Sequence, residues 1–133
     1  MKHVEVVASI IEHQGKTLCV QRNTSKYDYI SLKYEFPGGK VEEGETNEAA
    51  LVREIREELN MQIHDLTHFL TVEHSYPDFK ITMHSYKCKV ENPELKLSEH
   101  VDFKWRTPTE MDDLDWAGAD IPIVDKLKKE YNE

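Results

Sequence analysis

One stretch of the sequence, residues 38–61, constrains the fold and the chemistry of this chain more than any other. It begins with two consecutive glycines, Gly38 and Gly39, and continues into residues 46–59, which have the composition of a helix. Glycine allows close approach of the backbone to a ligand and positive φ values, and Thr46 is a suitable helix N-cap. The stretch therefore predicts a glycine-rich loop that leads directly into a helix.

The predicted helix carries an apolar stripe and, on another face, a cluster of carboxylates. Its apolar side chains recur at helical spacing and predict contact with a core: Leu51, Val52, Ile55 and Leu59. Glu54, Glu57 and Glu58 stand at i, i+3 and i+4, so their side chains share one turn. Like charges at this spacing repel, and a bound cation would remove the conflict. Mg²⁺ prefers carboxylate oxygens and usually completes its shell with substrate phosphates, so this helix predicts a magnesium site.

The same stretch resembles the Nudix hydrolase motif. The matching positions have the spacing of that motif throughout: Gly39, Glu45, Arg53, Glu54, Ile55, Glu57, Glu58 and Met61. Asn60 stands where the motif has its last glycine, and asparagine is the next-best residue for a left-handed helix C-terminus. Over nearly the whole chain the pattern is most similar to the small MutT and CTP pyrophosphohydrolase group. The resemblance implies an enzyme that hydrolyses a nucleotide pyrophosphate bond.

The pattern and the resemblance together predict an α+β fold in a single domain, residues 1–133. Apolar alternation predicts strands at residues 4–11, 17–22, 63–76, 80–90 and 102–106, a helical turn at 108–111 and a last helix at 121–131. We expect the apolar face of the last helix to contain Ile121, Val124, Leu127 and Tyr131. The resemblance implies an α/β/α Nudix sandwich, in which a mixed β-sheet is flanked by the catalytic helix and the C-terminal helix.

The resemblance also implies roles for the acidic residues. In such enzymes Glu54, Glu57 and Glu58, with the carbonyl of Gly39, would bind Mg²⁺, for which Mn²⁺ can substitute. Arg53 is also a candidate catalytic residue, and it would pair with Glu45 to hold the loop against the helix. The alternative is a solvated helix face with ordinary salt bridges.

The resemblance to MutT-like enzymes implies that Glu99 is a further metal ligand. Glu99 stands six residues before Trp105, as does a loop glutamate in MutT-like enzymes; the alternative is an exposed loop residue. Either Glu54 or Glu99 could deprotonate the attacking water. Cations that bridge a triphosphate polarise phosphorus and lower the pKa of bound water, and the resemblance implies cleavage between the α and β phosphates, which yields a nucleoside monophosphate and pyrophosphate.

Base preference is predicted from one residue. Asp120 lies where MutT-like enzymes have an asparagine that pairs with oxidised guanine, and Ala119-Asp120-Ile121-Pro122 resembles the CTP pyrophosphohydrolases. A carboxylate accepts hydrogen bonds and suits the amino group of cytosine, so (d)CTP or modified (d)NTPs are the predicted substrates. The alternative is that Asp120 only caps the last helix. The other candidates for substrate contact are Arg22, Phe36, Gly38, Gly39 and Lys40, with Tyr27 and Tyr29 of the loop at 23–33, for which surface packing is the alternative.

The composition of the chain limits the classes of molecule that it is expected to bind. The net charge of −9 argues against binding of a nucleic acid polymer or an anionic membrane. Cys19 and Cys88 lie in apolar runs and are predicted to be reduced core residues of a cytoplasmic protein, either a monomer or a homodimer. The seven histidines show no metal-binding spacing and are expected to be surface or core residues.

Three other functions remain open at this point. The chain could be an 8-oxo-dGTP-specific MutT-type diphosphatase, or a Nudix hydrolase of nucleoside diphosphate derivatives such as ADP-ribose, although such enzymes usually have longer insertions. It could also be a non-catalytic nucleotide-binding domain, against which the intact Glu54, Glu57 and Glu58 count.

Overall fold

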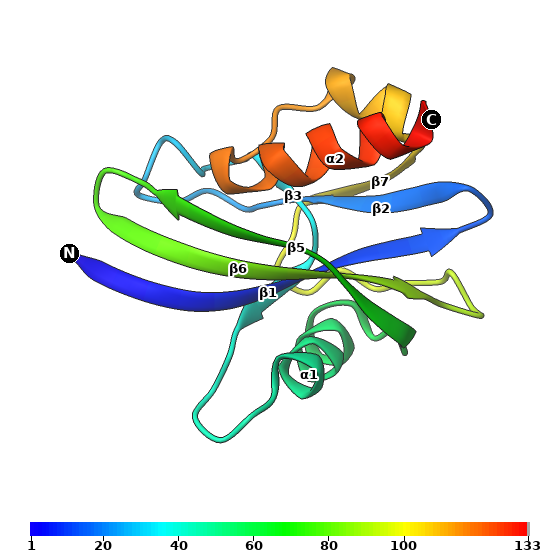
Figure 1. Ribbon diagram of the computed structural model, residues 1–133, viewed down its shortest axis with the longest axis horizontal. Coiled ribbons are helices and arrows are strands. Elements are labelled where there is room, and N and C mark those ends of the chain that lie inside the picture. The colour runs from blue at the N-terminus through cyan, green and yellow to red at the C-terminus, as the bar shows by residue number, and fades with distance from the viewer. Residues whose placement is uncertain (133) are drawn as a thin grey trace.

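The first strand has buried apolar side chains on both of its faces, and the fold accordingly has a layer on each side of the sheet. In the computed structural model, which describes residues 1–132, β1 (Lys2–His13) sends Ala8 and Ile10 to one face of the sheet and Val7 and Ile11 to the other. All four side chains are at most 1% exposed, so both faces of β1 are covered. A helix packs on each side, α1 (Asn47–Leu59) on one face and α2 (Ile121–Tyr131) on the other (Figure 1).

The sheet is mixed, as predicted. Its remaining strands are β2 (Lys16–Gln21), β3 (Tyr34–Glu35), β4 (Gly38–Lys40), β5 (His64–Ser75), β6 (Phe79–Lys89) and β7 (Asp102–Arg106). The main strand order is β3-β2-β1-β6-β5, with β4 paired to β1 and β7 to β2. β1 and β6 run parallel over their whole length, and the other named pairs are antiparallel. Two short 3₁₀ helices, η1 (Pro108–Asp113) and η2 (Gly118–Asp120), precede α2.

Helix α1 begins and ends as its sequence predicts. The side chain of Thr46 accepts a hydrogen bond from the Ala49 amide at 3.1 Å. Asn60 adopts φ 53° and ψ 39°, and its amide donates to the Arg56 carbonyl at 3.0 Å. These contacts satisfy terminal backbone groups that the helix cannot pair internally. The turn therefore forms without the glycine of the motif.

The glycine-rich segment differs from the prediction of a loop, because residues 38–40 form the short strand β4 against β1. A Cβ atom at Gly38 would lie 1.9 Å from the Val7 carbonyl oxygen. No side chain fits between these two strands. The first glycine of the pair is therefore required by close packing of β4 on β1, and neither glycine has a positive φ.

The predicted face of the last helix was partly wrong. Val124 is buried as expected, but the other buried residues of α2 are Ile123 and Leu127, of which only Leu127 was predicted. Ile121 and Tyr131 are 46% and 55% exposed. They occupy the first and last positions of the helix, beyond the central turns that contact the sheet.

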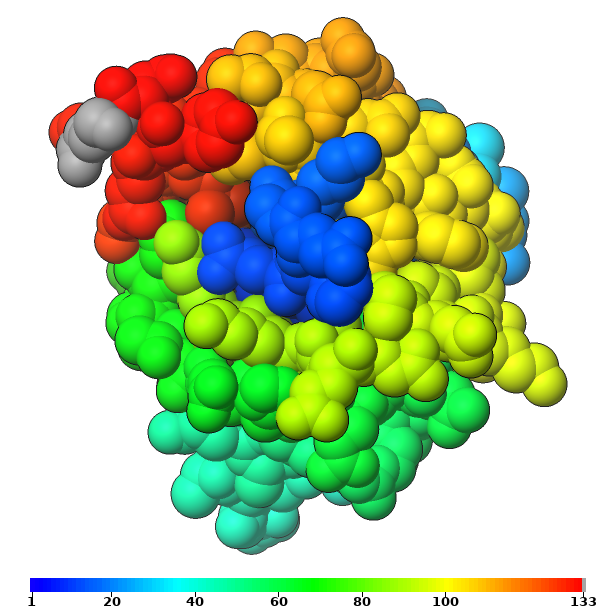
Figure 2. Space-filling view, turned by 90° about the vertical axis from the view of Figure 1, so that its right-hand side faces the viewer, coloured from blue at the N-terminus to red at the C-terminus, as the bar shows by residue number. Residues whose placement is uncertain are grey.

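The two cysteines are free and buried, as predicted, and burial raises the pKa of each thiol to about 12. Within residues 1–132 no helix has the length and apolar character needed to cross a membrane. The turn between β1 and β2 projects at the centre of the face shown in Figure 2, with α2 and α1 toward opposite ends of that face.

Candidate active site

A cavity of about 910 Å³ collects the residues that the sequence assigned to substrate, metal or catalysis, except Tyr29 of the loop at 23–33, which does not line it. These lining residues are Arg22, Phe36, Gly38, Gly39, Lys40, Arg53, Glu54, Glu57, Glu58, Glu99 and Asp120. The carboxylates of α1 and the Glu99 loop make one end of the cavity, called here the acidic end. The other end, the apolar end, is lined by β1, β6, the β5–β6 turn and the segment before α2. The cavity therefore joins segments that are distant in sequence.

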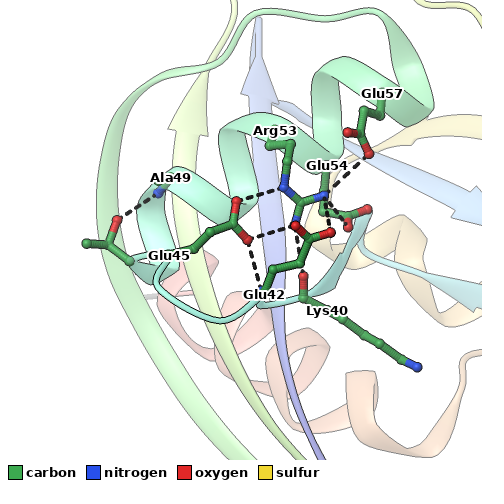
Figure 3. Close-up of polar contacts among 8 residues, drawn as sticks. Lys40, Glu42, Glu45, Ala49, Arg53, Glu54 and Glu57 are labelled. Carbon is green, nitrogen blue, oxygen red and sulfur yellow. Dashed lines mark hydrogen bonds and ion pairs between the residues drawn. The ribbon is translucent and has the colours of Figure 1, made fainter.

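Arg53 holds the acidic end together (Figure 3). Its guanidinium makes a two-pronged contact with Glu45, at 2.7 Å from Nε and 2.9 Å from Nη2. Nη1 donates to Glu54 at 2.9 Å and to Glu57 at 3.3 Å, while Nη2 donates to the Lys40 carbonyl at 3.1 Å. The pairing of Arg53 with Glu45 lowers the pKa of Glu45 to about 2. One guanidinium thus fixes β4, the loop after it and two of the α1 carboxylates.

Gly39 lies against the carboxylate of Glu54. A Cβ atom at Gly39 would be 2.5 Å from that carboxylate, so any larger residue would displace it. The second glycine of the pair thus brings the backbone next to a predicted metal ligand. The side chain of Lys40, in contrast, extends away from Arg53 (Figure 3).

Glu58 is the most buried carboxylate of the acidic end. The residue is 9% exposed, and its Oε2 atom is buried without a hydrogen-bond partner among residues 1–132. Burial, followed by the charges of Glu54, Glu99 and Glu35, raises the pKa of Glu58 to about 9. A buried unpaired carboxylate is unfavourable, and a cation at this position would relieve both causes of the shift.

Glu35 and His100 complete the acidic end, and neither was predicted from the sequence to belong to the site. Glu35 accepts from Arg22 Nη1 at 3.0 Å and contacts His100 Nε2 at 3.0 Å through its other oxygen. The His100 side chain is only 5% exposed. Glu35 precedes Phe36, and His100 follows Glu99, so nearness to predicted site residues was the one available signal.

The apolar end has a floor of aliphatic side chains and an aromatic wall. Its floor is formed by adjacent positions of β1 and β6: Val4, Val6, Ile81 and Met83. Tyr76 and Phe79 form the wall, with ring centroids 5.2 Å apart, and Tyr27 lies 5.7 Å from Phe79. Tyr29 packs behind this wall, 5.2 Å from the Tyr76 ring, and donates to Asp78 at 2.7 Å.

Asp120 lies at the apolar end and is 4% exposed. Its Oδ1 accepts the Phe36 amide at 3.0 Å, and it makes no side-chain capping bond to α2, contrary to the capping alternative. Burial and the charge of Glu35 hold the pKa of Asp120 well above its usual range. The Tyr76 hydroxyl accepts the Ala119 amide at 2.9 Å and so supports the turn before Asp120. Phe36 stacks on Trp116 beside it, with ring centroids 4.7 Å apart.

Comparison with protein families agrees with this geometry. Residues 1–127 match the NUDIX domain. The chain belongs to the Nudix family. This Nudix chain is 37% identical, over 94% of its length and 91% of the relative, to a CTP pyrophosphohydrolase from Escherichia coli (strain K12). It is 30% identical to an 8-oxo-dGTP diphosphatase from the same organism, over 97% of its length and 99% of that relative.

A solved structure of a Nudix relative supports the same fold. It is the solution structure of a MutT protein from methicillin-resistant Staphylococcus aureus 252, 40% identical to this chain with a TM-score of 0.75. The match covers 98% of this chain and 99% of that one. The predicted family, the α/β/α Nudix sandwich and an enzyme of the Nudix hydrolase kind are thereby confirmed.

Nudix hydrolases generally use divalent metal ions, and the acidic end fits such an ion. Its donors are carboxylate oxygens, which hard divalent cations prefer, and the unpaired Oε2 of Glu58 offers one of them. Within residues 1–132 no three acidic, histidine or cysteine side chains already surround a common point. Arg53 instead holds Glu54 and Glu57. A metal ion would therefore bind to Glu58 and to carboxylates that now face the guanidinium.

Proposed function

We propose that this chain, as one domain of residues 1–133, is a Mg²⁺-dependent nucleoside triphosphate pyrophosphohydrolase that releases a nucleoside monophosphate and pyrophosphate. Cytosine nucleotides, (d)CTP or modified forms, are its proposed substrates, and Mn²⁺ can substitute for Mg²⁺. The observation that carries the proposal is the single cavity with an acidic end and an apolar end. A triphosphate bound through cations suits the first, and a planar base suits the second.

The acidic end would hold the metal through Glu54, Glu57, Glu58 and Glu99, with the backbone of Gly39. Bound divalent ions would neutralise the phosphates and lower the pKa of an attacking water. Arg53 orients Glu54 and Glu57, since its guanidinium bonds both. Glu54 or Glu99 then accepts the proton of that water. The protein contributes position and electrostatic stabilisation rather than covalent chemistry.

The apolar end would select the base through Asp120. Burial and the nearby charge of Glu35 favour the protonated form of the Asp120 carboxyl, which can both donate and accept a hydrogen bond. Cytosine presents an amino donor at N4 beside the ring acceptor N3. A neutral Asp120 carboxyl complements both atoms, whereas an ionised one would complement only the amino group. The relative named CTP pyrophosphohydrolase supports the same preference.

A substrate panel tests the proposal. Pyrophosphate release with Mg²⁺ would be measured from CTP, dCTP, 5-methyl-dCTP, 8-oxo-dGTP, dGTP and ADP-ribose, beside the Glu57→Gln variant. We expect metal-dependent release that favours a cytosine nucleotide and is lost in the variant. Preference for 8-oxo-dGTP would support the MutT-type specificity instead. Cleavage of ADP-ribose alone would contradict the triphosphate assignment, and cleavage of nothing would favour a non-catalytic binding domain.

A further inference from the structure

The loop that carries Glu99 is attached to the helix on one side of this residue. The Ser98 hydroxyl donates to the Glu58 carbonyl at 2.9 Å, and the Ser98 amide donates to the same carbonyl at 3.3 Å. The Lys96 amide donates to the Leu59 carbonyl at 3.0 Å. These bonds satisfy carbonyls at the C-terminus of α1 that have no partner within the helix. They place the loop beside Glu58, and the charge of Glu99 contributes to the raised pKa of the Glu58 carboxylate.

On the other side of Glu99 the loop is attached to the sheet. His100 Nε2 lies 3.0 Å from Oε2 of Glu35, and the Val101 amide donates to the Gln21 carbonyl at 3.0 Å. Since a carboxylate only accepts hydrogen bonds, Nε2 carries the proton in this contact. The other oxygen of Glu35 is held by Arg22, so Glu35 cannot rotate freely away from His100.

The two attachments differ in what they fix. Ser98 bonds backbone carbonyls of the helix, whereas His100 is a nearly buried side chain that bonds a carboxylate of β3 inside the cavity. Glu99 itself is exposed, and the one group that its carboxylate pairs with among residues 1–132 is the carboxyl of Glu58, which repels it when both are ionised. Its position beside Glu58 therefore depends on the residues before and after it in the chain.

We propose that His100 is a positioning residue for Glu99, and that its hydrogen bond to Glu35 keeps the Glu99 carboxylate next to Glu58. The inference rests on the proposed function, in which Glu58 and Glu99 bind the metal. His100 acts through Glu99 and does not contact the base. Its loss lowers metal affinity and kcat, whereas KM for the nucleotide, measured at saturating Mg²⁺, stays nearly unchanged.

The test compares two substitutions of one residue. His100→Leu keeps the size of the side chain and removes the donor, and His100→Gln places an amide N–H at a reach similar to that of Nε2. Mn²⁺ affinity would be measured without nucleotide, from the electron paramagnetic resonance signal of free Mn²⁺, and kcat and KM would be measured separately. We expect His100→Leu to lose about tenfold in both Mn²⁺ affinity and kcat, the scale for groups that orient metal ligands. His100→Gln should recover most of the loss.

Controls separate positioning from general damage. His68→Leu makes the same substitution on β5, at an exposed histidine that bonds Thr71 outside the cavity, and should change neither quantity. Thermal unfolding identifies variants that do not fold. If His100→Leu does not fold, His100→Asn against His100→Gln repeats the comparison with two amides of different reach, and the shorter one is expected to lose metal affinity.

Two results would overturn the inference. The first is a folded His100→Leu with the Mn²⁺ affinity and kcat of the unmodified protein, and the second is a folded His100→Gln as impaired as the leucine variant. Failure of the proposed function is distinguishable from both, because the unmodified protein would then release no pyrophosphate. The Mn²⁺ titration would still decide the role of His100.

Discussion

The two ends of the cavity are built in opposite ways. At the acidic end, the carboxylates of Glu45, Glu54, Glu57 and Glu58 come from one segment of 14 residues, whereas Glu35 and Glu99 come from β3 and the loop before β7. The apolar end instead takes side chains from β1, the loop at 23–33, the β5–β6 turn and the segment before α2. One end is charged and local in sequence, whereas the other is mainly apolar and assembled by the sheet.

This difference separates the residues expected to determine the rate of hydrolysis from those expected to determine the preference for a base. The spacing of residues along one helix is enough to place the carboxylates of α1. The proposed catalytic groups of this helix can therefore be combined with different base pockets. The proposed base contacts depend on the register of β1 with β6, where Val4 faces Ile81 and Val6 faces Met83. Phe36 connects the two ends, because its amide bonds Asp120 and its chain continues through Pro37 into β4. We therefore expect most substitutions to alter kcat or base preference, but not both.

The largest expected effect is at the acidic end. Glu57→Gln should lower kcat about 100-fold or more, since a bound metal supplies several kcal/mol and about 1.4 kcal/mol is tenfold in rate. Glu57 is 61% exposed and makes only a 3.3 Å contact with Arg53, so folding should be unaffected. Steady-state kinetics with dCTP and dGTP measures kcat and the ratio of the two KM values. That ratio should not change.

The matched control is Glu48→Gln, which removes an exposed carboxylate from the first turn of the same helix. It should keep full activity. Equal losses in the two variants, or a changed base preference in Glu57→Gln, would contradict the separation of the two ends.

The second effect is at the apolar end. Asp120→Ala should raise KM for cytosine nucleotides about 10- to 100-fold, because a lost buried hydrogen-bonding group costs about 1–3 kcal/mol. Asp120→Asn keeps a donor and an acceptor and should retain the preference for cytosine nucleotides.

The same residue predicts a pH dependence. Because the pKa of Asp120 is raised, its proton is lost as pH increases, and KM of the unmodified protein should rise with pH. KM of Asp120→Asn should not follow, and parallel pH profiles of KM would disprove the neutral carboxyl.

The sequence predicted the acidic end because its information is local. The Gly39, Glu45 and Arg53 spacing, the Thr46 cap and the left-handed Asn60 all follow from one helix and its flanks. Glu35 and His100 could not be found in this way, because they meet only when the loop at 94–101 folds across β3. The exposed ends of α2 were missed for a similar reason: helical spacing gives the face of a helix but not where the sheet beneath it ends.

A smaller effect concerns the stability of the acidic end. The pKa of Glu45 is lowered to about 2 by Arg53, so its pairing stabilises the fold above the ordinary carboxyl pKa and is lost as pH falls toward 2. The melting temperature should fall more steeply over this range in the unmodified protein than in Glu45→Gln, by a few degrees, because the two paired side chains are still 20% and 23% exposed and water screens their attraction. Glu43→Gln, an exposed neighbour, should keep the steep profile.

The two cysteines report on the two sides of the sheet separately. Cys19 belongs to the core on the α2 side, behind the apolar end, and Cys88 belongs to the core under α1. Both are at most 1% exposed, with thiol pKa values raised to about 12, so neither should react with a thiol reagent at neutral pH until the chain unfolds. The rates would be resolved by mass spectrometry of labelled peptides. Faster labelling of Cys19 than of Cys88 in the native protein would show that the assembled apolar end opens more readily than the local acidic end, whereas equal rates would mean that both sides open only in global unfolding.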